Sequence, residues 1–202
     1  RKQVMLRLAI RDLSSQADLS EVMLSMTELA EVTINFALKH HENWLTQSNR
    51  FGLPIGEQSN TTQHMLIVAM GKLGGGELNV SSDVDLIFVY PEDGETNGAK
   101  SISNHEFFAR LGRKLIASLN DYTVDGYVFR VDMRLRPHGE NSPLAISFPM
   151  LEEYFIKQGR EWERYAWIKG RVIAGHTDTE AGSTLMEKIV RPFVFRKYLD
   201  FG

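Results

Sequence analysis

The sequence has no cysteine among its 202 residues, which excludes disulfide bonds and thiolate metal sites. It has no apolar run that approaches the roughly 20 residues of a membrane-spanning helix, and no recognisable signal peptide. We therefore expect a cytoplasmic chain that has no membrane partner.

An excess of one charge is also lacking. Lysine and arginine number 23 against 26 aspartate and glutamate residues, which leaves a formal net charge of −3. Proteins that bind nucleic acid through its phosphates usually present a broad basic surface, so we expect no nucleic-acid partner. A site for an anion must then be built locally, from a few cationic side chains.

Apolar residues make up 43% of the chain, which is enough to fill a substantial core. Because the chain begins at Arg1 rather than at methionine, we expect it to be a fragment of a larger protein. We expect three parts: an N-terminal helical segment at 1–60, packed on a core at 61–150 that holds the candidate site, and a C-terminal helical segment at 151–202.

Hydrophobic periodicity predicts an α+β fold, with a small mixed sheet, flanking helices and helical segments at both termini. Helices are expected at 1–11, 18–44, 104–119, 149–157 and 178–199, and strands at 64–70, 83–90 and 127–135. The polar residues 92–103 are expected to be mobile. The long second helix is expected to bury residues that include Met26 and Phe36. In the stretch 160–174, the residues expected to face inward are Trp162, Tyr165, Ala166, Ile168 and Ile173.

Two aspartates open the strand predicted at 83–90. Asp83 and Asp85 are two residues apart, so their carboxylates leave the same face of a strand. Two carboxylates that converge repel each other unless a cation lies between them. For this pair taken alone, an Asp-x-Asp on a solvated strand end is the favoured interpretation, so further residues must support a cation site.

The strand predicted at 127–135 alternates apolar and charged residues. Asp132 shares the charged face with Arg130, Arg134 and Arg136. A half-exposed strand with solvated arginines is an equal alternative for this strand taken alone. Three arginines around one carboxylate suit a phosphate better, because arginine matches phosphate oxygens with two parallel hydrogen bonds. If the two strands are neighbours, Asp83, Asp85 and Asp132 supply three oxygen ligands for two Mg²⁺ ions, or for Mn²⁺.

The stretch GKLGGGELNVSSDVDLIFVY resembles the nucleotidyltransferase superfamily of the DNA polymerase beta type. This resemblance implies Asp83, Asp85 and Asp132 as catalytic metal ligands. This sequence differs from the superfamily at Lys72, where the superfamily usually has serine or glycine. The residues that would bind nucleotide or phosphate are Gly71, Lys72, Gly75, Gly76, Ser82, Arg130, Arg134, Arg136, Lys169 and Arg171. Glu77, His138 and Glu163 are weaker candidates.

A narrower resemblance covers about residues 70–175. Together with YVFRVDMRLRPHGENSPL and GREWERYAWIKGRVIAG, the glycine-rich stretch is similar to the bacterial bifunctional glutamine synthetase adenylyltransferase/adenylyl-removing enzymes. The segment GGGELNVSSD is similar to the corresponding sequence of their N-terminal, adenylyl-removing domain. The resemblance implies that inorganic phosphate removes AMP from a tyrosine of glutamine synthetase, giving ADP, and that the PII signalling protein is a partner.

Three alternatives stay open. The related adenylylating domain would use the same metal ligands but would bind ATP and transfer AMP from it onto glutamine synthetase. A non-catalytic regulatory module with this fold would need no metal ligands, whereas all three carboxylates are present. A nucleotidyltransferase that acts on nucleic acid or on a small molecule is a third possibility, and the acidic charge balance disfavours a polymer substrate.

Overall fold

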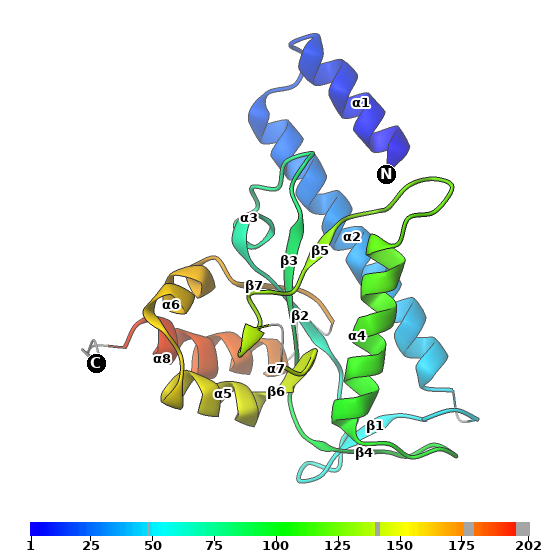
Figure 1. Cartoon of the computed structure of the whole chain (residues 1–202), viewed down its shortest axis with the longest axis vertical. Coiled ribbons are helices and arrows are strands. Elements are labelled where there is room, and N and C mark those ends of the chain that lie inside the picture. The colour runs from blue at the N-terminus through cyan, green and yellow to red at the C-terminus, as the bar shows by residue number, and fades with distance from the viewer. Residues whose placement is uncertain (48, 140–141, 176–179, 197–202) are drawn as a thin grey trace.

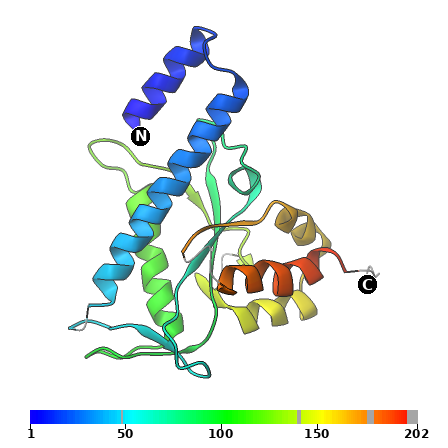
Figure 2. The same cartoon turned by 180° about the vertical axis from the view of Figure 1, so that it is seen from behind.

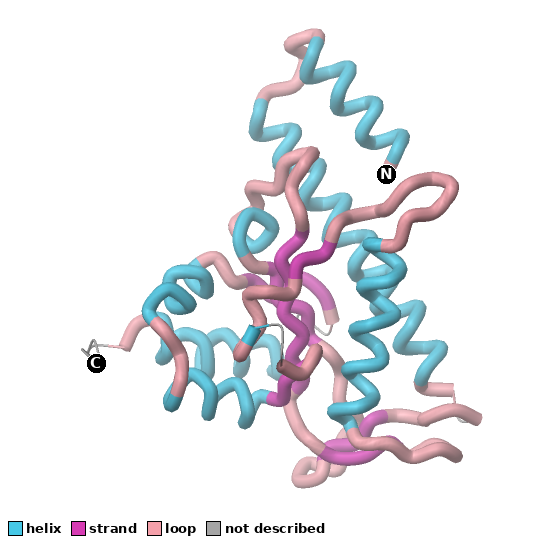
Figure 3. The backbone as a smooth tube through the Cα atoms, viewed as in Figure 1, coloured by secondary structure: helices cyan, strands magenta, loops and turns pink. Residues whose placement is uncertain are grey.

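The computed structural model describes residues 1–47, 49–139, 142–175 and 180–196 (Figure 1). Its helices are α1 Lys2–Leu13, α2 Leu19–Leu45, α3 Gly71–Gly74, α4 Asn104–Asn120, α5 Phe148–Lys157, α6 Glu161–Ile168, α7 Glu180–Ser183, the π-helix η2 Thr184–Val190 and α8 Arg191–Val194. Its strands are β1 Pro54–Gly56, β2 Leu66–Ala69, β3 Val84–Tyr90, β4 Gly94–Thr96, β5 Val131–Asp132, β6 Ala145–Ser147 and β7 Arg171–Ala174. The expected α+β class is confirmed: a small mixed sheet lies among helices (Figure 3).

The main sheet has the strand order β5-β3-β2-β7, and β6 also pairs with β3. β2 is antiparallel to both β3 and β7, whereas β5 and β6 run parallel to β3. β3 and β2 are thus the central strands. Their almost entirely apolar sequences agree with burial on both faces.

Each face of the sheet has its own apolar cluster. Ile67 in β2 and Phe88 in β3 belong to the first cluster, with residues of α2 and α4. The neighbouring Val68 and Ile87 belong to the second cluster, with residues of α5, α6, η2 and α8. Figure 2 shows α2 and α4 together on one side of the sheet and the C-terminal helices on the other. Side-chain alternation along the strands therefore divides the core into two layers.

The long helix α2 begins where the sequence indicates, because the Asp18 carboxylate accepts a hydrogen bond of 2.8 Å from the Glu21 backbone N–H. Met26 is fully buried, as expected, but Phe36 is 74% exposed. The buried positions follow Ala30 with Ile34 and Leu38, so the contact face is rotated away from Phe36.

The strand expected at 127–135 is mostly wrong, since only Val131–Asp132 forms a strand. Before it, the backbone N–H of Val128 and that of Phe129 both donate to the Leu119 carbonyl at the end of α4. After it, the Asp132 carboxylate accepts a hydrogen bond of 2.8 Å from the Arg134 backbone N–H. An aspartate that binds the backbone two residues ahead makes a turn, so the chain leaves the sheet at this point.

Four short strands, β1, β4, β6 and β7, were absent from the expected elements. β1 and β4 pair as a separate two-stranded sheet, so residues 92–103 include regular structure. β7 follows α6 directly, which divides the stretch 160–174 into a helix and a strand. The expected inward set there is confirmed only in part. Trp162, Tyr165 and Ile168 are 51%, 73% and 59% exposed, whereas Ile173 is buried and Ala166 is half-buried. The buried aromatic residue of α6 is Trp167.

The expected last helix is divided into α7, η2 and α8, with Pro192 in the first turn of α8; residues 178, 179 and 197–199 lie outside the described part. Within the described ranges, no helix is both long and apolar enough to cross a membrane.

Candidate active site at the start of β3

The candidate site lies where β3 begins beside β5. Asp85 and Asp132 are directly opposite each other in this parallel pair, so their side chains leave the same face of the sheet. That face is the one that Ile87 also reaches, toward α5 and α6. Asp83 comes one residue before β3 begins. The three carboxylates predicted as one group therefore come together at one end of the sheet.

Gly71 allows the glycine-rich turn to pass close to Asp85. Its φ is +54°, a left-handed conformation that favours glycine, and a Cβ atom built there would lie 2.8 Å from Asp85 Oδ2. The turn is tied to β3 by a hydrogen bond of 2.9 Å from the Met70 backbone N–H to the Asp85 carbonyl. Glycine is thus required at position 71 for two reasons: the left-handed backbone conformation, and the lack of space for a side chain beside Asp85.

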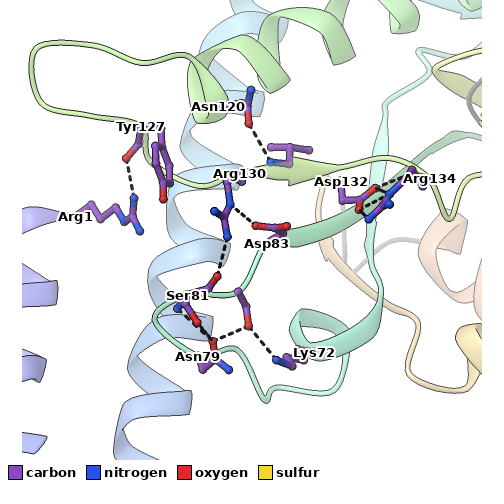
Figure 4. A network of polar contacts seen from close by, with 12 residues as sticks. Arg1, Lys72, Asn79, Ser81, Asp83, Asn120, Tyr127, Arg130, Asp132 and Arg134 are labelled. Atoms are coloured by element: carbon purple, nitrogen blue, oxygen red, sulfur yellow. Dashed lines mark hydrogen bonds and ion pairs between the residues drawn. The ribbon is translucent and has the colours of Figure 1, made fainter.

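Two of the three carboxylates pair with the predicted arginines (Figure 4). Arg130 forms an ion pair with Asp83 and donates a hydrogen bond of 3.0 Å to the Ser81 carbonyl. The Arg134 guanidinium donates to both oxygens of Asp132: Nε lies 3.1 Å from Oδ1 and 2.8 Å from Oδ2, and Nη2 lies 2.5 Å from Oδ2. Arg136 lies in the following turn, where its Nη1 donates to the Met133 carbonyl at 2.8 Å.

The carboxylates differ in their electrostatic surroundings. The hydrogen bond from Arg134 lowers the pKa of Asp132 below its usual value. Burial raises the pKa of Asp85 above its usual value, and the nearby charges of Asp132 and Asp83 raise that pKa further. Ionisation of Asp85 is therefore less favourable than that of Asp132 without an added cation.

The donor set fits a divalent cation by its chemistry, because Mg²⁺ prefers carboxylate oxygens. Among the described residues, however, no three His, Asp or Glu side chains are arranged as a ready metal site. Arg130 and Arg134 hold two of the carboxylates in the arrangement seen here. A metal at this place would take over their role as counter-charge, and Asp83, Asp85 and Asp132 would hold it.

The rest of the glycine-rich turn is held by Asn79. Its side-chain oxygen accepts hydrogen bonds from Ser82 Oγ at 2.8 Å and from the Ser81 backbone N–H at 3.2 Å. Lys72 Nζ lies 3.4 Å from Ser82 Oγ, so the residue that departs from the superfamily pattern points toward the start of β3. Gly76 has a φ of +72° and open space where a Cβ atom would be.

Lys169 and Arg171 lie on the other side of this turn. Lys169 forms an ion pair of 2.9 Å with Glu77. Arg171 donates to the Leu73 and Gly74 carbonyls, both at 3.2 Å, and pairs with Glu31 of α2 at 2.6 Å. Arg171 thus supports the backbone of α3, whereas Lys169 contacts the side chain of Glu77.

Two cavities adjoin the carboxylates. The first, about 440 Å³, is lined by Asp83, Asp132, Arg130, Arg134 and Arg136, among others. We call the second, about 580 Å³, the arginine cavity; its lining includes Arg134, Arg136, Tyr154, Arg160, Trp162 and Glu163. Because Arg134 and Arg136 line both, the arginine cavity adjoins the carboxylate site.

Five residues of the arginine cavity were missing from the sequence-based site: Gly139, Tyr154, Gln158, Arg160 and Trp162. Glu163, a weak candidate, is only 4% exposed. It accepts hydrogen bonds of 2.6 Å from the Tyr154 hydroxyl and 2.8 Å from the Arg160 backbone N–H. A charged residue within an otherwise helical pattern was the only available signal, and it does not distinguish a buried carboxylate from a solvated one.

The chain is similar in sequence to known proteins along its whole length. The family model of glutamate-ammonia ligase adenylyltransferase matches residues 1–185. The chain belongs to this family. The adenylyltransferase family includes bifunctional glutamine synthetase adenylyltransferase/adenylyl-removing enzymes from Nitrosomonas europaea, Chromobacterium violaceum and Pseudomonas aeruginosa, to which the chain is 75%, 56% and 53% identical. The whole chain is covered in each case, but it spans only 21%, 22% and 20% of these relatives.

Proposed function

We propose that this chain removes AMP from an adenylylated tyrosine of glutamine synthetase by phosphorolysis. The observation that carries the proposal is the register of β3 and β5, which places Asp85 opposite Asp132 beside arginine-lined cavities. The family match supports a nucleotidyl-group reaction, and the relatives are named as both adenylyltransferase and adenylyl-removing. The segment GGGELNVSSD favours removal of AMP over transfer of AMP, because it resembles the adenylyl-removing domain.

The reaction requires two anions to approach each other. An oxygen of inorganic phosphate attacks the phosphorus of the AMP-tyrosine diester, and the bond between that phosphorus and the tyrosine oxygen breaks. The tyrosine oxygen takes a proton, and the nucleotide leaves as ADP. The main requirements are therefore positioning and neutralisation of charge.

The residues of the chain divide these tasks. Asp83, Asp85 and Asp132 would hold magnesium, which when bound neutralises phosphate oxygens and stabilises the leaving oxygen. Arg130 and Arg134 would exchange their carboxylate partners for phosphate oxygens, which match a guanidinium equally well. Arg136, at the boundary of the two cavities, would bind and orient the attacking phosphate.

The decisive assay follows the label of inorganic phosphate. The full-length protein that carries this chain is incubated with adenylylated glutamine synthetase, Mg²⁺ and radiolabelled phosphate. Phosphorolysis places the label in ADP, whereas hydrolysis would give unlabelled AMP. Absence of labelled ADP would contradict the proposal, and transfer of AMP from ATP onto glutamine synthetase would select the adenylylating alternative.

Asp85→Asn is the variant that tests the site. We expect it to reduce labelled ADP formation by at least about a hundredfold, because one charge at the centre of the site is lost. Asp125→Asn is the matched control, since Asp125 is exposed and pairs only with Lys2 in the described structure. Equal activity of the two variants would remove Asp85 from the site.

A further inference from the structure

The arginine cavity has the size and the lining of a nucleotide site. Its volume of about 580 Å³ lies within the roughly 300–1,000 Å³ of small-molecule sites and far exceeds the size of one phosphate ion. Three arginines line it: Arg134 and Arg136 at the boundary with the carboxylate site, and Arg160 just before α6. A ligand that fills it therefore has an anionic end and a larger uncharged body.

Among the described residues, Glu163 is the carboxylate that lines the cavity. Both of its oxygens already accept hydrogen bonds within the protein. One oxygen accepts from the Tyr154 hydroxyl and the other from the Arg160 backbone N–H. These bonds join α5 to the start of α6 and reduce the negative charge that Glu163 offers to a ligand. The cavity thus presents a net positive surface on a fixed wall.

Trp162 supplies an aromatic surface in the same cavity. It lies in the first turn of α6 and is 51% exposed, although tryptophan is usually more deeply buried in a folded domain. A half-exposed indole beside arginines is suited to stack on a flat base while the cations bind the attached phosphates.

We propose that the arginine cavity binds an adenine nucleotide, with the base on Trp162 and the phosphates at Arg134 and Arg136. In this orientation the phosphates lie at the boundary of the two cavities, next to the carboxylates. Trp162 is then a residue that determines specificity for a base. The inference rests on the proposed function in one respect: adenine is named as the base because the proposed phosphorolysis yields ADP.

The test is direct binding, measured by isothermal titration of the chain with ADP and, separately, with pyrophosphate. Trp162→Ala is expected to weaken ADP binding about tenfold or more, since stacking on an aromatic side chain contributes about that factor or more per base. It is expected to leave pyrophosphate binding within about twofold of the wild type. Trp162→Phe keeps an aromatic surface and should retain most of the ADP affinity.

Tyr165→Ala is the matched control, because Tyr165 is 73% exposed on the same helix and is not part of the cavity lining. Circular dichroism checks that each variant is folded. Unchanged ADP affinity in a folded Trp162→Ala variant, or no ADP binding by the wild type, would overturn the inference.

The binding results are independent of turnover. If Trp162→Ala selectively loses ADP affinity while no labelled ADP forms from adenylylated glutamine synthetase, the cavity is a nucleotide site and phosphorolysis is wrong. If labelled ADP forms but Trp162→Ala leaves ADP affinity unchanged, the reaction stands and the cavity assignment is overturned.

Discussion

Gly71 shows how one residue links the turn to the carboxylate site. We predict that Gly71→Ala lowers the free energy of unfolding by about 1–3 kcal/mol, because its φ is +54° and the added Cβ atom would crowd Asp85 Oδ2. It should also reduce activity. Gly76→Ala is the control, since Gly76 has a φ of +72° without any atom within 4 Å of the added Cβ. Equilibrium unfolding measures the stability of each variant, and turnover assays measure its activity. Equal losses in the two variants would show that crowding of Asp85 plays no part.

Tyr154 and Glu163 make a second residue-scale prediction. Burial raises the pKa of Tyr154 to about 12, and the hydrogen bond to Glu163 adds to the effect. A tyrosine with a raised pKa contributes stability that is complete below its usual value near 10 and is lost as pH rises toward 12. Two pKa units correspond to about 2–3 kcal/mol.

Tyr154→Phe should therefore flatten the loss of stability between about pH 10 and 12. At neutral pH the variant should be less stable by about 1–3 kcal/mol, because Glu163 loses a buried donor. Urea unfolding at several pH values measures both effects. An unchanged alkaline profile would show that Tyr154 does not titrate there.

At the scale of elements, Arg171 connects β7, α3 and α2 through three hydrogen bonds. We predict that Arg171→Ala lowers the unfolding free energy by about 1–3 kcal/mol, since the Leu73 and Gly74 carbonyls lose their donor. Lys169→Ala should cost at most about 1 kcal/mol, because its ion pair with Glu77 is half exposed. Thermal unfolding distinguishes the two. If Arg171→Ala lost activity while its stability stayed unchanged, this result would instead favour the sequence-based prediction that Arg171 binds phosphate.

The elements themselves were predicted unevenly. The helices 104–119 and 149–157 agree with α4 and α5, because each carries an apolar face of regular spacing. β5 is only two residues long, because Asp132 binds the Arg134 backbone and turns the chain. The alternation of charge in 127–135 indicated one face of a long strand. Instead, Arg130 comes directly before β5, and Arg134 and Arg136 lie in the turn that follows it.

At the scale of the whole molecule, the sheet joins two apolar clusters. Phe107 belongs to the first and Trp167 to the second, and their exposures are 0% and 2%. We predict that Phe107→Ala and Trp167→Ala each lower the unfolding free energy by about 3–5 kcal/mol. Because β2 and β3 contribute to both clusters, each variant should unfold in one transition by fluorescence and by circular dichroism. Two separate transitions would show that the layers unfold independently.

The sequence by itself determined the main helices and the two central strands, because each depends on local periodicity. Only the tertiary structure decided that Asp132 lies opposite Asp85, since strand register depends on partners far apart in the chain. It also placed Arg171 beneath the glycine turn and Trp162 in the arginine cavity. These positions are set by how α6 and β7 pack on the sheet, and no local pattern contains that information.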